Sequence, residues 1–349
     1  MPVSLISSNQ ESGRLSRSQV NQLIDLNRYP IDQLEGGAGR DLIKICQNNL
    51  ATQAIALLPG FIRPNAISKM AEDAQDLIDQ AHRYDQPRAA FYEHPNHHHR
   101  ARDEDGWSTL RSKRHPNRYC QILNFQIPNN SNLRAIYLWP ELTEFVRRVL
   151  DVDNLYPSLC PHLALTMKVA FAGDLDGWHY DPNDGVITLM LQSSESGGEF
   201  EYAPYIRNER EENYAGVKRL FDSPDTEAQC INLEAGTFTL FNGRFSMHRV
   251  RPIGPTKQPR IVAIFSYDQR PDMVFSQDYI DLLRSFPRAS RQKFVGKVIS
   301  ENGSKGVGAV FKRPFFETSL FCNIKASPDR TEDIRPFFDS QNAAEGCGL

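Results

Sequence analysis

Hydrophobic positions follow two different periods along this chain, and the two periods predict helices and strands. Spacings of three or four residues are typical of one buried helix face. They predict helices at 18–26, 41–49, 64–78, 141–150 and 276–286, with a helical excursion within 206–229. Alternating or nearly continuous apolar runs are typical of strands. They predict strands at 54–61, 118–127, 163–171, 185–192, 199–202, 236–241 and 260–267.

Two histidines and one aspartate stand out among these strands. His179 and Asp181 are separated by one residue on an extended segment, so their side chains point to the same face. His248 follows the strand at 236–241, after a turn that contains glycine. Two imidazoles and one carboxylate make the facial triad of non-haem Fe(II) oxygenases, which leaves adjacent metal positions open for co-substrate and oxygen. A capped turn explains a lone His-x-Asp pair as well, but the ordered set favours a metal site.

Arg260 extends this set, because it begins the apolar run that follows His248. A guanidinium fork fixed at the start of a strand suits the far carboxylate of a 2-oxo acid such as 2-oxoglutarate. We therefore expect Arg260 to bind this co-substrate. Arg249 is a second cofactor-binding candidate, although surface charge or pairing with Glu199 or Glu201 explains its presence equally well.

Two segments carry a resemblance to a known family. They are Gly197–Arg207, followed by Glu212–Tyr214, and Gly243–Val250. Over about 164–271 the chain resembles the Fe(II)- and 2-oxoglutarate-dependent family of free amino acid halogenases and hydroxylases. The resemblance implies a mainly β fold, a double-stranded β-helix or jelly roll with N-terminal and flanking α-helices. It also implies Fe(II), 2-oxoglutarate and O2, and a small, amine-bearing or amino-acid-like substrate.

Asp181 separates the two chemistries of this family. Halogenases of the family lack the carboxylate, and chloride takes the vacated position on iron. Because this chain has Asp181, the resemblance implies hydroxylation, or a related desaturation, with succinate and CO2 as co-products. The same residue disfavours halogenation.

The expected domain organisation follows from where these motifs lie. We expect the β-helix domain to occupy 51–275. A helical extension would precede it at 1–50, and a closing helix with a poorly ordered tail would follow at 276–349. The glycine-rich stretch at 36–40 lacks the lysine and the spacing of a phosphate-binding loop, so we expect a turn there.

Composition narrows the class of partner. A hydrophobic content of 40% supports a sizeable core, and a net charge of −3 leaves no global electrostatic signal for nucleic acid or anionic lipid. Six dispersed cysteines without a Cys-x-x-Cys pair indicate a reducing compartment. We find neither a signal peptide nor a membrane span, and expect a soluble cytoplasmic enzyme that acts on a small molecule.

Several alternatives stay open at this point. A peptidyl hydroxylase would share the triad, and a jelly-roll binding module with a vestigial iron site is the non-enzyme alternative. Asp176 and Asp184 are either turn formers or partners for a substrate ammonium. The adjacent histidines His97–His99 fit a flap near the site mouth better than a second metal site, because consecutive side chains diverge. Oligomeric state and substrate identity are not predicted.

Overall fold

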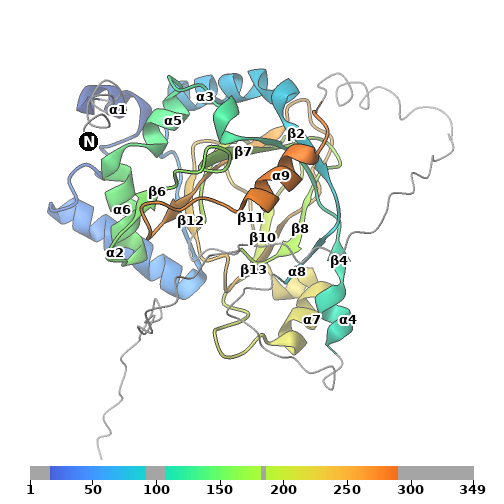
Figure 1. Cartoon of the computed structure of the whole chain (residues 1–349). Helices are drawn as coiled ribbons and strands as arrows, with labels where there is room; N and C mark the ends of the chain where they lie inside the picture. The colour runs from blue at the N-terminus through green and yellow to red at the C-terminus, as the bar shows by residue number, and fades with distance from the viewer. Residues whose placement is uncertain (1–15, 92–106, 182–185, 290–349) are drawn as a thin grey trace, which may run out of the picture.

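Two antiparallel β-sheets face each other in the computed structural model of this chain, and helices surround them (Figure 1). The structure describes residues 16–91, 107–181 and 186–289. The His97–His99 segment and the tail from residue 290 lie outside these residues.

The larger sheet has seven strands in the order β1-β12-β9-β14-β7-β5-β2. One of its faces is strongly apolar, because alternate residues of each strand, such as Leu189 in β9 and Ala263 in β14, enter the main hydrophobic core. Thr188 and Val262, their neighbours along the chain, point the other way, toward the small sheet. The strands are β1 (Ile55–Leu58), β2 (His82–Asp85), β5 (Arg118–Ile122), β7 (Leu165–Ala170), β9 (Val186–Gln192), β12 (Phe238–Phe241) and β14 (Arg260–Phe265).

The smaller sheet has four strands in the order β11-β10-β13-β8. They are β8 (Asp176–His179), β10 (Phe200–Ala203), β11 (Gln229–Ile231) and β13 (Met247–Val250). From β7 to β14 the chain places β7, β9, β12 and β14 in the large sheet and the other four strands in the small one. This is the strand order of a double-stranded β-helix, so the predicted fold class is confirmed. Two short pairs, β3 (Arg88–Ala89) with β4 (Arg114–His115) and β6 (Tyr156–Pro157) with β15 (Tyr267–Asp268), lie outside both sheets.

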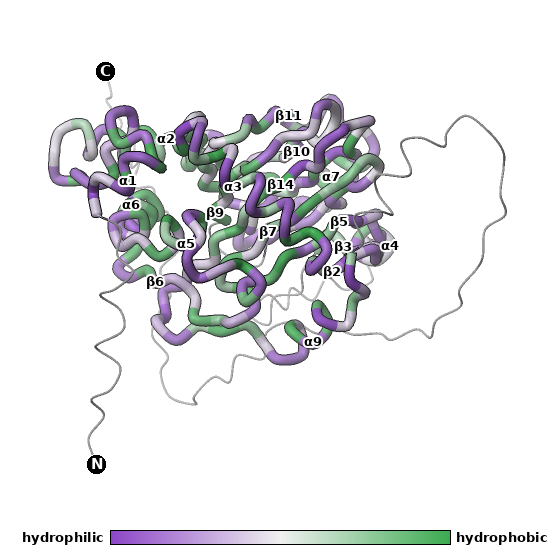
Figure 2. Tube along the Cα trace, turned by 90° about the horizontal axis from the view of Figure 1, so that it is seen from above, coloured by the Kyte–Doolittle hydropathy of each residue, from purple (hydrophilic) through white to green (hydrophobic). Residues whose placement is uncertain are grey.

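Helices cover the outer face of the large sheet. α3 carries Ala66, Met70 and Ala74 on one stripe into the core, and Pro64 begins it at a position where the missing N–H costs nothing. Helices such as α2 and α6 alternate hydrophilic and hydrophobic colour along their length, as expected with one buried face (Figure 2). The helices are α1 (Arg17–Leu23), α2 (Gly37–Gln53), α3 (Pro64–Asp76), α4 (Ser108–Ser112), α5 (Asn132–Tyr137), α6 (Pro140–Leu150), α7 (Tyr214–Asp222), α8 (Pro224–Glu227) and α9 (Gln277–Ser285).

The terminal elements join the same body as the sheets. Val20 of α1 and Leu50 of α2 belong to the main core, and the Ala289 N–H donates to Ala81 O beside β2. The proposed boundaries at residues 51 and 275 stay predictions. None of the helices within the described residues has the length and hydrophobicity that a membrane crossing requires.

Two local predictions need correction. The helix expected from residue 41 begins at Gly37, with Gly36 as its N-cap, because exposed glycines are tolerated at a helix N-terminus. The strand expected at 118–127 ends at Ile122, and a short 3-10 helix, η4 (Asn124–Gln126), follows it. There the Gln126 side chain accepts a hydrogen bond from the Leu123 N–H and closes the turn. A second short 3-10 helix, η2, lies at Ile78–Gln80.

Candidate metal centre

Strand pairing brings the two predicted histidines together. β8 and β13 are antiparallel neighbours, and their register places His248 directly opposite His179. Asp181 follows β8, and its backbone N–H donates to Gly243 O at 3.0 Å, in the turn between β12 and β13. Because His179 and Asp181 are two residues apart, both side chains reach the face of the small sheet that looks at the large sheet.

The three side chains converge on one point. One ligand atom from each of His179, Asp181 and His248 lies within 4.8 Å of the others. The Nε2 atom of His248 is 3.3 Å from Asp181 Oδ2, and the Nε2 atom of His179 is 3.7 Å from Asp181 Oδ1. Both histidines are buried, with His179 4% and His248 6% exposed. The spacing is that of ligands around a single ion.

Hydrogen bonds at the far side of each ring determine which nitrogen is free. His179 Nδ1 is 2.7 Å from Gly177 O, and His248 Nδ1 is 3.0 Å from Ser246 O. A carbonyl oxygen only accepts, so Nδ1 of each ring carries the proton and donates. Burial, the largest influence, lowers the pKa of both imidazoles below their usual value, so both are neutral near pH 7. Each Nε2 therefore presents a lone pair.

The residues fit a metal ion for a reason visible in the structure. Two lone pairs and one carboxylate meet without a proton between them, and Asp181 Oδ2 is buried with no hydrogen-bond partner. A buried charge without a partner is costly, and a bound cation removes that cost. Two imidazoles and one carboxylate suit Fe(II) with open positions, and the Nδ1–carbonyl bonds fix the orientation of the rings.

Arg260 is the second unpaired charge of this region. It begins β14, is 7% exposed, and has no hydrogen-bond or ion-pair partner among the described residues. Burial lowers its pKa to about 10, although the negative charge of Asp176 acts in the opposite direction. A guanidinium that is buried without a partner favours the binding of an anionic ligand.

A buried ion cluster lies beside His179. Asp176 Oδ2 is 2.5 Å from Lys168 Nζ, Asp176 Oδ1 is 3.2 Å from Arg88 Nη1, and the same oxygen is 3.9 Å from His179 Nδ1. Burial alone would raise the pKa of Asp176, but the positive charges of Lys168 and Arg88 lower it well below its usual value. Both carboxylate oxygens are thus engaged, which argues against Asp176 as a partner for a substrate ammonium. Asp184 lies outside the described residues.

Sequence reasoning missed Lys168 and Arg88. For Lys168 a signal existed, since it is the only charged residue of the apolar run 163–171. Its register opposite Val262 places it diagonally from Arg260 on the same face of the sheet. Arg88 lies on the short strand β3, where no periodic pattern marks it.

Arg249 lies on the other side of the small sheet. As the neighbour of His248 along β13 it must point the opposite way. Its guanidinium pairs with Glu201 and lies 4.6 Å from the ring of Trp178. The structure therefore does not bring Arg249 together with the triad.

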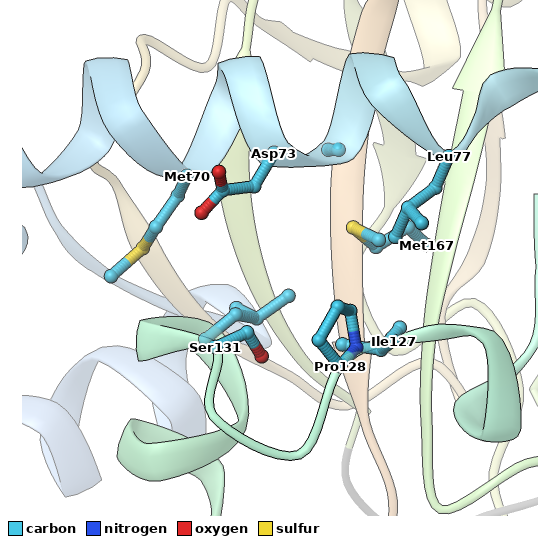
Figure 3. Close-up of a pocket in the computed structure, with 9 residues that line it drawn as sticks. Met70, Asp73, Leu77, Ile127, Pro128, Ser131 and Met167 are labelled. Carbon is cyan, nitrogen blue, oxygen red and sulfur yellow. The ribbon is translucent and has the colours of Figure 1, made fainter.

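The pocket in Figure 3 is separate from the metal centre. Residues of α3 and its C-cap, of the segment before α5 and the first turn of α5, and Met167 of β7 line it. Met167 belongs to the main core on the helix-covered face of the large sheet, whereas the triad lies on the opposite side of that sheet. Asp73 is the only ionisable residue in the lining, so this pocket offers no set of metal ligands.

Comparisons with known proteins were made with the sequence and with the fold. A family model described as "Halogenase D" matches residues 39–279. No curated protein matches the sequence. A 2OG-Fe(II) oxygenase family oxidoreductase from Burkholderia pseudomallei is 13% identical, with a TM-score of 0.40 over 68% of this chain and 93% of that one.

Two further solved structures are similar to a comparable degree. A prolyl-4-hydroxylase from Pseudomonas putida is 13% identical, with a TM-score of 0.39 over 66% of this chain and 99% of that one. The α-ketoglutarate-dependent carbocyclase SnoK from nogalamycin biosynthesis is 13% identical, with a TM-score of 0.44 over 71% and 91%. We base the fold on the strand order and the family on the sequence match.

Proposed function

Because the chain belongs to the halogenase D family, whose model spans residues 39–279, we propose that it is an Fe(II)- and 2-oxoglutarate-dependent oxygenase. Within this family we assign it hydroxylation, or a related desaturation, of a small amino-acid-like substrate. Halogenation is not assigned. The observation that carries this choice is the Asp181 carboxylate, which faces both imidazoles at 3.3 and 3.7 Å.

The metal would be held by His179, Asp181 and His248. When bound, Fe(II) would supply the redox chemistry that couples oxygen to the decarboxylation of 2-oxoglutarate, to give succinate and CO2. With Asp181 as third ligand, no position is left vacant on the protein side for chloride. The neutral imidazoles bind without first losing a proton.

Arg260 would bind the far carboxylate of 2-oxoglutarate. Its buried guanidinium has no described protein partner, and the dianionic co-substrate would supply the missing charge. Aromatic rings beside His248 would exclude water from the metal centre, since the centroids of Phe241 and Phe200 lie 4.9 and 5.5 Å from the centroid of the His248 ring.

A reducing cellular compartment fits this proposal. Cys46, Cys120, Cys160 and Cys230 are all free, and the first three are buried. We place the enzyme in the cytoplasm, where free thiols persist.

The experiment is an assay of the full chain with Fe(II), 2-oxoglutarate, air and chloride, against a panel of free amino acids. Succinate should form, and the stimulated reaction should give a product with one added oxygen or two fewer hydrogens. A chlorinated product would overturn the assignment of hydroxylation, and stimulation by peptides alone would favour a peptidyl hydroxylase. Absence of both iron uptake and succinate would favour a binding module.

A further inference from the structure

Gly243 lies against the carboxylate of Asp181. A Cβ atom built on Gly243 would stand 1.9 Å from Asp181 Oδ2 and 2.7 Å from Asp181 Cγ. Real Cβ contacts essentially never fall below 3.0 Å. Any side chain at position 243 would therefore occupy the space that the carboxylate fills.

The backbone itself does not require glycine at this position. Gly243 is not among the residues with positive φ, so an L-residue can adopt its conformation. Its carbonyl oxygen accepts the hydrogen bond from the Asp181 N–H, and that bond involves no side chain. The three heavy atoms nearest to the added carbon all belong to the Asp181 side chain: Oδ2, Cγ and, at 3.0 Å, Cβ.

The carboxylate can yield at little cost to the fold. It is the far end of a rotatable side chain, and Asp181 Oδ2 has no hydrogen bond to lose. Turning it away would, however, remove one of three ligands from the point where His179 and His248 converge. The effect of a side chain at 243 should fall on metal binding far more than on stability.

We propose that Gly243 is the positioning residue for Asp181, and that its lack of a side chain is what makes this carboxylate a metal ligand. The proposal rests on the metal centre of the proposed function and not on the reaction. It is therefore testable with a metal ion alone, without substrate or turnover.

The test is a double-mutant cycle with Co²⁺ binding to the full chain, measured by titration calorimetry. Gly243→Ala should weaken Co²⁺ binding about 10- to 100-fold, the range typical of residues that orient ligands. Asp181→Ala should weaken it at least as much. In the Asp181→Ala background, Gly243→Ala should add nothing, because the group it displaces is already gone. Gly37→Ala is the matched control, since nothing lies within 4 Å of the added carbon there.

Each outcome decides the proposal. Wild-type affinity in Gly243→Ala would overturn it, and so would a further loss in the double variant, which would indicate a structural role. If Gly243→Ala does not fold, a folded double variant supports a clash with Asp181, and an unfolded one overturns it. Failure of the wild type to bind Co²⁺ would instead remove the metal centre itself, and with it the proposed function.

Discussion

The metal centre on the inner face of the small sheet and the ion pairs on its outer face treat their charged residues in opposite ways. On the inner face, which looks at the large sheet, Asp181 Oδ2 is buried without a hydrogen-bond partner, and Arg260 of β14 in the large sheet has no partner among the described residues either. On the outer face Glu201, 1% exposed, is paired with both Arg249 and Arg251, and Arg207 is paired with Glu212.

This difference separates binding from folding. A charge that the fold pairs internally is already stabilised, whereas one that is buried and left unpaired costs free energy unless a ligand arrives. The unpaired atoms behind β8 belong to neutral groups, the Tyr180 hydroxyl and His115 Nε2. Between the two sheets, the unpaired Asp181 Oδ2 and the Arg260 guanidinium lie where a cation and a dicarboxylate would bind.

The largest effect should come from removing an inner-face imidazole. His179→Ala and His248→Ala should each abolish iron-dependent succinate formation, because two ligands do not hold the ion. The assay is succinate released from 2-oxoglutarate by the Fe(II)-loaded full chain. His162→Ala, a histidine packed on Phe125 away from the triad, is the control and should keep activity. Normal turnover in either triad variant would refute the site.

Arg260→Ala should act on the co-substrate. Truncating one partner of a buried charge pair costs about 2–5 kcal/mol, so the KM for 2-oxoglutarate should rise roughly 100-fold, with a smaller change in kcat. The matched control is Arg249→Ala on the outer face, which should leave this KM unchanged. Equal effects of the two substitutions would erase the distinction between the faces.

Glu201→Gln on the outer face should lower the stability of the fold and leave metal binding unchanged. It breaks ion pairs to two arginines that are partly exposed, 23% and 41%, so solvent offsets part of the loss. We expect the free energy of unfolding in urea to fall by about 2 kcal/mol, with Fe(II) affinity unchanged. A loss of iron binding at unchanged stability would place Glu201 in the metal site, against this account.

The smallest effect concerns pH. Burial first, then the charges of Lys113, Arg249 and Arg88, lower the pKa of His115 from 6.5 to about 4. The unfolded chain therefore binds this proton at a higher pH than the folded chain, so stability falls as pH drops from 6.5 toward 4.

The measurement is urea unfolding of His115→Gln and of the wild type at pH 7.5 and 5.5. Between these values the wild type should lose about 1 kcal/mol more than the variant. Equal losses would mean that His115 already titrates normally in the fold.

Much of the site could be predicted because the strand period is simple. Because His179 and Asp181 are two residues apart, the strand period alone places them on one face. The family resemblance is confirmed by the family model that matches residues 39–279. The same period shows why Arg249 could not join His248, since adjacent residues on a strand point apart.

Other features depended on tertiary contacts. The pairing of Asp176 with Lys168 joins β8 to β7, and its pairing with Arg88 reaches a strand far away in the sequence. The role of Gly243 depends on a contact across the turn, and no pattern of hydrophobic and polar residues encodes it.

The most direct test of the central claim is the stoichiometry of Fe(II) binding by the full chain under anaerobic conditions, measured by equilibrium dialysis. The account predicts one Fe(II) per wild-type chain and loss of that site in both His179→Ala and His248→Ala. A wild type that binds no Fe(II), or histidine variants that bind it as the wild type does, would contradict the account.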